Sequence, residues 1–153
     1  GGGRPQQLYI LTELGKEMSP RQYSWLAQLV VASVRREEGM ENMGKRMNEI
    51  GANVAQQIRS QYPYLTTHKE KVEKLTEVMD QLGYNARNTT VSGGEAVIEA
   101  DNCVFHTMAK KDLEICHLDR GLMENFTDSK VEQDECMARG GNVCRFKLTS
   151  NVS

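Results

Sequence analysis

Apolar residues recur with the period of an α-helix along much of the first 82 positions. A first helix is predicted from Pro20 to about Glu38, because proline suits a first helical turn and Gly39 ends the pattern. A second helix follows directly. The apolar faces consist of Tyr23, Leu26, Val30 and Val34 in the first helix and of Met40, Met43, Met47, Ile50, Val54 and Ile58 in the second. Faces rich in methionine usually pack into a core, so we expect the second helix to be a core helix.

A third helix is predicted after the break at Tyr62–Tyr64. Thr67 and Glu70 have the spacing of a capping box at its start, and Gly83 ends it. Its apolar stripe is Val72, Leu75, Val78, Met79 and Leu82. His68 falls in the first turn, where we expect it to be solvated.

Beyond residue 83 the pattern shortens to the period of two that is typical of strands. Strands are predicted at Tyr84–Thr90 and Glu95–Ala100, and a helix from about Asp112 to Phe126. A hairpin of Lys130–Glu135 and Val143–Leu148 completes the chain. One face of the second strand carries Ala96, Ile98 and Ala100. Helices first and an antiparallel sheet later predict the α+β class, with N-terminal helices packed on a sheet that ends in a cysteine-bearing hairpin.

The first predicted helix has more apolar surface than one stripe requires. Trp25, Leu29 and Val31 widen the face beyond the four residues at helical spacing. Packing within the domain explains such a surface, and so does a subunit interface. A homodimer is therefore one expectation from this segment.

All four cysteines of the chain lie between Cys103 and Cys144. Cys103 and Cys116 are separated by twelve residues, and Cys136 and Cys144 by seven. This grouping predicts one thiol site. The alternative is packing alone, since free cysteine behaves as a small apolar residue.

The second cysteine pair has a geometric interpretation. Arg139–Asn142 has the composition of a tight turn, and a hairpin symmetric about Gly140 places Cys136 opposite Cys144. Two thiols so placed could bind a metal ion or cluster, or close a disulfide.

Cys116 is predicted on a helix whose apolar stripe is Ile115, Leu118, Leu122 and Phe126. It shares its own side with Asp119, Arg120 and Met123, so we expect it to be more than one further core residue. His106 and His117 are the nearest alternative ligands, although neither has a standard zinc-finger spacing.

Composition limits the partners and the cell compartment that we expect for this chain. The 153 residues carry 19 basic and 21 acidic side chains, so the net charge does not indicate nucleic-acid or membrane binding. No apolar run is long enough to span a membrane, and no signal peptide is recognisable. We therefore expect a cytoplasmic protein with reduced thiols.

Several motifs together resemble a known family. Gly3–Pro5, Tyr9–Thr12, Gly15, Pro20–Arg21, Tyr23 and Leu26–Ala27 are similar to the wing and following helix of DeoR-like winged-helix repressors, of the type that controls bacterial iron-sulfur cluster assembly. Asn102–Cys103, the spacing to Cys116 and the last cysteine beside a glycine turn are similar to that repressor's cluster-binding region. The layout of strands, helices and hairpin also looks like 4-vinyl-reductase-type small-ligand domains.

The resemblance implies a remnant of the wing at residues 1–19 and a dimerisation and cysteine-rich sensor domain at residues 20–153. It implies a 4Fe-4S cluster at Cys103, Cys116 and Cys144, with Cys136 in place of a family cysteine that would fall near Ser129. Zinc is the alternative metal, since four thiolates suit both. Operator DNA would be contacted only through the missing winged helix. Arg4 and Lys16 could reach phosphate but not read sequence.

The function expected from these features is sensing by a bacterial transcriptional regulator, switched by a cysteine-bound cofactor. The alternative is a metal-free module that binds a small ligand or senses redox state through its thiols. An enzyme is not expected. The sequence has no HExxH, P-loop or GxGxxG motif, and adjacent Cys116 and His117 point in different directions on a helix.

Overall fold

The computed structural model describes residues 20–91, 93–102, 109–110 and 113–151. The chain divides into two compact units, residues 1–39 and residues 40–153, and each is described by itself. Helix α2 (Pro20–Arg59) begins in the first unit and continues into the second. At Gly39 the backbone leaves helical geometry, with φ 79° and ψ 167°, so α2 consists of two helices. The predicted break at this glycine is confirmed, because only glycine adopts such angles without strain.

In the first unit, the helix carries several exposed apolar side chains. Trp25, Val30 and Leu29 have exposed fractions of 62%, 53% and 47%. The prediction of a wing remnant at residues 1–19 falls outside the described residues.

The second unit contains an antiparallel sheet of four strands in the order β1–β2–β4–β3. The strands are β1 (Ala86–Val91), β2 (Glu95–Ala100), β3 (Ser129–Glu135) and β4 (Cys144–Ser150). Two hairpins, β1–β2 and β3–β4, are joined by pairing of β2 with β4. The predicted strands and the α+β class are confirmed.

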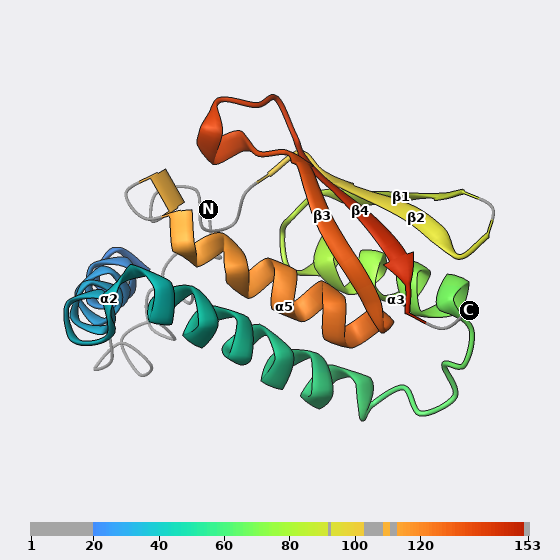
Figure 1. Cartoon of the computed structure of the whole chain (residues 1–153), viewed down its shortest axis with the longest axis horizontal. Helices are drawn as coiled ribbons and strands as arrows, with labels where there is room; N and C mark the ends of the chain where they lie inside the picture. Colours follow the sequence, from blue (N-terminus) through green and yellow to red (C-terminus); the bar gives the residue numbers. More distant parts are fainter. Residues whose placement is uncertain (1–19, 92, 103–108, 111–112, 152–153) are drawn as a thin grey trace, which may run out of the picture. The chain divides into compact units, whose positions relative to one another are not determined.

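Helices α3 (His68–Gln81) and α5 (Cys116–Thr127) cover one face of this sheet, and residues 40–59 of α2 lie against α5 (Figure 1). A short 3₁₀ helix, η1 (Leu113–Ile115), leads into α5. On β2 the buried side chains of Ala96, Ile98 and Ala100 alternate with half-buried ones, as expected for a strand with one face toward the core. The core therefore lies between one sheet face and the helices.

The crossing of α2 and α5 depends on two glycines. A Cβ at Gly51 would overlap the carbonyl oxygen of Leu118, and a Cβ at Gly121 would overlap that of Asn48. The two backbones are thus in direct contact, which fixes the axial position of α5. Nearby, Met43 and Met47 are buried as predicted, whereas Met40 and Ile50 are exposed.

Helix α3 begins as the sequence indicates. The Thr67 hydroxyl accepts a hydrogen bond from the Glu70 amide at 3.1 Å and lies 3.0 Å from the Glu70 carboxylate. Gly83, with φ 101°, follows its last turn. This helix packs on β1 and α5.

Candidate functional site

The β3–β4 hairpin carries two of the predicted thiols at its tip. Glu135 pairs with Arg145, the register expected for symmetry about Gly140, so Cys136 and Cys144 are the next opposed positions. The connection includes a 3₁₀ turn, η2 (Met137–Arg139), which ends at Gly140 with φ 94°. The carboxylate of Glu135 accepts hydrogen bonds from the backbone of Asn142 and Val143 at 3.0 and 2.9 Å. The tip is therefore held by its own backbone contacts.

Both hairpin thiols are buried, with exposed fractions of 7% for Cys136 and 6% for Cys144. The Met137 amide donates a hydrogen bond to the Cys144 sulfur at 3.4 Å. Neither cysteine forms a disulfide, and neither does Cys116.

Cys116 is the first residue of α5 and meets the hairpin tip across a sequence distance of twenty residues. Its thiol lies close enough to that of Cys136 for the two to influence each other's ionisation. Burial raises the pKa of Cys116 to about 12, and the neighbouring Cys136, Asp119 and Cys144 add to the shift. The fold therefore brings three of the four predicted thiols together.

Cys103 lies outside the described residues. It follows Ala100 by three positions in the sequence, and Ala100 pairs with Cys144 in the sheet. The described end of strand β2 therefore lies beside one of the hairpin thiols.

No three His, Cys, Asp or Glu side chains in the described ranges are spaced to bind one metal ion. The three thiols converge without forming a metal site in their present arrangement. Nothing in the structure confirms an iron-sulfur cluster or zinc as the occupant.

A buried carboxyl lies one turn beyond Cys116. Asp119 is 7% exposed and accepts a hydrogen bond from the Tyr84 hydroxyl at 2.6 Å. Burial raises the pKa of Asp119 to about 6, and the tyrosine bond only partly offsets that shift. The sequence placed Asp119 beside Cys116 but gave no sign of its tyrosine partner.

The histidines do not join the thiols. His117 lies 3.3 Å from the Glu114 carboxylate, and His106 is outside the described residues. The prediction that His68 is merely solvated was wrong, because its Nε2 lies 2.7 Å from the Ser129 hydroxyl. Ser129 itself begins β3, at the opposite end of that strand from Cys136, so it cannot act as a ligand beside the thiols.

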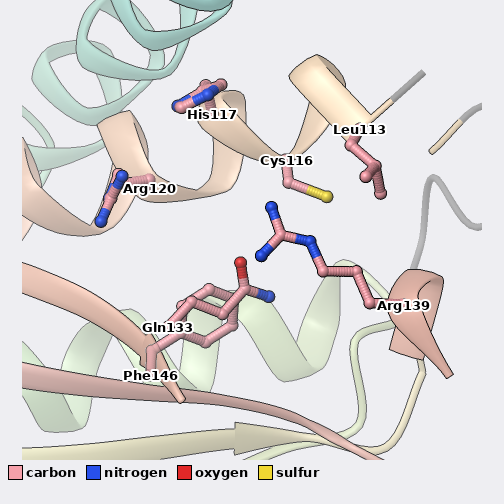
Figure 2. A pocket seen from close by; sticks show the side chains of 7 residues that line it. All are labelled: Leu113, Cys116, His117, Arg120, Gln133, Arg139 and Phe146. Atoms are coloured by element: carbon pink, nitrogen blue, oxygen red, sulfur yellow. The ribbon is translucent and has the colours of Figure 1, made fainter. Parts of the chain in front are cut away.

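Sequence reasoning missed two polar residues beside Cys116, whereas it placed Arg120 on the same side of the helix as this cysteine. Gln133 on β3 and Arg139 on η2 line a small cavity with Cys116 and Arg120, and Figure 2 shows them directed toward it. The pattern marked Arg139 as part of a turn and Gln133 as a strand residue. Only the pairing of the hairpin with α5 brings them together.

Along the part of the chain that is described, no helix has the length and apolar character needed to cross a membrane.

Two solved structures show a similar fold. A crystal structure of trafficking protein particle complex subunit 3 from Naegleria fowleri, covalently bound to palmitic acid, is 17% identical, with a TM-score of 0.55 over 84% of this chain and 95% of that one. An H-NOX domain from Shewanella oneidensis in the Fe(II)CO ligation state is 12% identical, with a TM-score of 0.60 over 95% of this chain and 90% of that one. At these identities the likeness concerns the fold alone. No protein of curated function matches the sequence.

The family is shown by sequence. The profile described as methanogen output domain 1 matches residues 11–149, and this chain belongs to that family. The resemblance to DeoR-like winged-helix repressors of cluster assembly was therefore wrong, and the DNA-binding role that it implied has no support. The motifs behind it, such as Gly3–Pro5 and Tyr9–Thr12, are short runs of turn and strand residues that suit many folds.

Proposed function

We propose that this member of the methanogen output domain 1 family is an effector-sensing output domain whose state is set at a thiol site formed by Cys103, Cys116, Cys136 and Cys144. The observation that carries the proposal is the meeting of Cys116, at the start of α5, with both thiols of the hairpin tip. The pairing of Ala100 with Cys144 supports the inclusion of Cys103. The proposed role is regulatory and not catalytic.

The chemistry of the site favours a soft cation. Several thiols in one buried place cannot all ionise at modest cost, as the raised pKa of Cys116 illustrates. A bound cation removes that cost, because it stabilises the thiolates that the fold alone disfavours. Four thiolates suit an iron-sulfur cluster and zinc alike, and an iron-sulfur cluster is our first candidate.

The described ligands would have to move to share one ion. Three of the thiols are close, yet no group of three ligands in the described ranges has metal-binding spacing. The hairpin tip is the element that can adjust, since η2 and its exposed residues Arg139 and Gly140 project beyond the paired strands (Figure 1). Occupancy would then tie the first turn of α5 to the hairpin, and loss of the occupant would release it.

Helix α5 can carry this change because it is held closely elsewhere. At Gly121 the backbone of α5 lies directly against that of α2. A shift in the first turn of α5 would therefore move α2 as well, because closely packed backbones transmit small displacements. The coupling from thiols to output is in this account mechanical, through α5.

The second candidate is a redox switch without metal. The nearness of the Cys116 and Cys136 thiols favours it, because two neighbouring thiols can form a disulfide on oxidation. The raised pKa of Cys116 opposes it, since a thiol reacts with oxidants mainly as the thiolate. The metal-bound form is therefore the better-supported state.

The likeness to an H-NOX domain in the Fe(II)CO ligation state supports a sensing role, because that fold can serve a domain with a ligated iron. The exposed Trp25, Leu29 and Val30 of the first unit support a homodimer. Sedimentation velocity of the Trp25→Glu variant tests the dimer. A variant with the wild-type sedimentation coefficient would contradict it.

The decisive experiment for the thiol site is anaerobic purification, followed by an absorption spectrum and analysis of iron, sulfide and zinc. We expect visible absorption and about four iron and four sulfide per chain, lost in Cys136→Ser. Colourless protein with one zinc per chain would show that the occupant of the thiol site is zinc and not a cluster. Colourless, metal-free protein in which Cys116 and Cys136 form a disulfide on oxidation would leave the redox switch. Metal-free protein with no such disulfide would contradict the proposal.

The matched control is Ser60→Cys. Ser60 is exposed, and its hydroxyl bonds only to the backbone of Gln57 in the described contacts. An added thiol there should leave the metal content unchanged, which separates the site from non-specific uptake.

A further inference from the structure

A small polar cavity lies between the first turns of α5 and the hairpin. Its volume is about 120 Å³, and its lining residues are Leu113, Cys116, His117, Arg120, Gln133, Arg139 and Phe146. In Figure 2 the guanidinium of Arg139 extends from η2 toward Cys116 and Gln133. The volume suits a ligand of a few non-hydrogen atoms.

The charge of the cavity is positive and only partly compensated. Arg120 donates to the carbonyl oxygen of Val131 at 3.1 and 3.3 Å and lies 3.4 Å from the Glu124 carboxylate. The guanidinium of Arg139 has no ion pair or hydrogen bond within the described part of the chain, and neither does the side-chain amide of Gln133. One guanidinium and one amide therefore remain available on the cavity wall.

This donor set has a definite chemical preference. A guanidinium presents N–H groups in a planar fork that matches two oxygens of one anion. The amide of Gln133, also on the hairpin, adds a further donor, and Leu113 and Phe146 give the cavity an apolar border. A neutral or cationic ligand would leave the charge of Arg139 without a partner.

We propose that this cavity binds a small oxyanion, of the carboxylate or phosphate class, between Arg139 of the hairpin and Arg120 and Cys116 of α5. The site goes beyond the thiol function proposed above and does not depend on it. It joins the same two elements, however, so an anion in the cavity would hold the hairpin tip against α5 from the other side of Cys116.

The test is a titration of the purified full chain with sodium phosphate, sodium sulfate and sodium acetate, at constant ionic strength set by sodium chloride. Calorimetry gives the affinity, and the arginine Nε–Hε signals in a ¹H–¹⁵N spectrum give the location. We expect saturable binding of at least one of the three anions at one site per chain, with shifts of the Arg139 and Arg120 signals. The relative affinities distinguish carboxylate from phosphate.

Two variants and one control make the result specific. Arg139→Gln should weaken the affinity about tenfold or more, as expected for loss of a charge-assisted contact. Gln133→Glu is nearly isosteric and brings a negative charge to the wall, so it should abolish binding while the chain stays folded. Arg87→Gln removes the same charge from the exposed edge of the sheet, outside the cavity, and should leave the affinity unchanged.

Absence of saturable binding for all three anions would overturn the proposal, as would binding that Arg139→Gln and Gln133→Glu leave intact. The metal-free Cys136→Ser variant separates the two proposals. Anion binding that persists in it, with no metal site in the wild type, would sink the thiol function alone. Metal binding in a protein that takes up no anion would sink this inference alone.

Discussion

The two ends of strand β3 carry polar clusters of opposite character. At its start, the base cluster consists of His68, Lys71, Thr127, Asp128 and Ser129. At its end, the tip cluster consists of Cys116, Gln133, Cys136, Arg139 and Cys144. Both lie where a helix terminus meets the edge of the same sheet (Figure 1).

The base cluster satisfies its own members. The carboxylate of Asp128 forms ion pairs with Lys71 at 2.8 Å and with Arg59 at 2.9 Å. The hydroxyl of Ser129 lies 2.7 Å from the ring nitrogen of His68 and 2.8 Å from the hydroxyl of Thr127. A hollow of about 280 Å³ borders it, but the charges around it already have partners. Such a network stabilises the fold and leaves no unpaired group among its described members for a ligand to bind.

The tip cluster leaves the side chains of Gln133 and Arg139 without partners among the described residues. Cys116 is a half-buried thiol near other thiols, and the guanidinium of Arg139 lacks a partner among the described residues. Polar groups arranged in this way cost stability in the empty protein and gain it when a ligand pairs with them. The difference between the two ends thus separates a structural cluster from a candidate binding site.

The largest expected effect is at the base. Ser129→Ala removes a hydroxyl that is only 2% exposed and that contacts both His68 and Thr127, so we expect the free energy of unfolding to fall by about 2 kcal/mol. Urea denaturation measures the change. The control, Ser60→Ala, removes an exposed hydroxyl and should change it by less than about 0.5 kcal/mol. Equal effects of the two substitutions would remove the distinction between a buried network and a surface hydroxyl.

The next effect concerns the carboxyl near the tip. The folded pKa of Asp119, about 6, lies above the unfolded value of about 4, so the metal-free protein should lose stability as the pH rises between those values. Asp119→Asn removes that charge and keeps an oxygen for Tyr84. We expect it to flatten the slope and to stabilise the protein at pH 7.5 by about 1.5 kcal/mol, the amide's new N–H groups limiting the gain.

Thermal or urea unfolding across pH 4 to 7.5 checks this slope, as in acid-denaturation studies. Asp101→Asn is the control, because Asp101 is exposed and paired with Arg87. An unchanged slope in Asp119→Asn would show that another group is responsible.

The smallest expected effects on the free energy of unfolding come from removing one positive charge at each end of β3. Lys71→Gln should lower the free energy of unfolding by about 1 kcal/mol, because Lys71 is part-buried against Asp128. Arg139→Gln should change it by less than about 0.5 kcal/mol, because Arg139 is exposed and unpaired in the described structure. If Arg139→Gln proved the more destabilising, the tip would be a structural cluster like the base.

Local patterns predicted the elements well. The period of two at Ala96–Ala100, the capping box of Thr67 and Glu70 and the glycine at position 39 each act through neighbouring residues, and all three were confirmed. The turn composition around Gly140 also fixed the register that opposes Cys136 and Cys144.

Contacts between distant segments were harder to predict. The bond between His68 and Ser129 spans 61 positions, and that between Tyr84 and Asp119 spans 35, so no periodicity reveals either. Three of the four cysteines that the sequence groups lie near one another, and the place of Cys103 stays a prediction because it is outside the described residues. The family prediction was wrong, because short wing-like motifs carry little information about the packing that defines a fold.

Hydrogen–deuterium exchange shows whether occupancy of the thiol site ties the start of α5 to the β3–β4 hairpin. Anaerobic protein is compared before and after reconstitution with iron and sulfide, and separately with one equivalent of zinc. The account predicts that at least one addition slows exchange in η1, the first turn of α5 and residues 133–145, while the base of β3 stays unchanged. Unchanged exchange at the tip with every addition, or protection confined to the base, would contradict it.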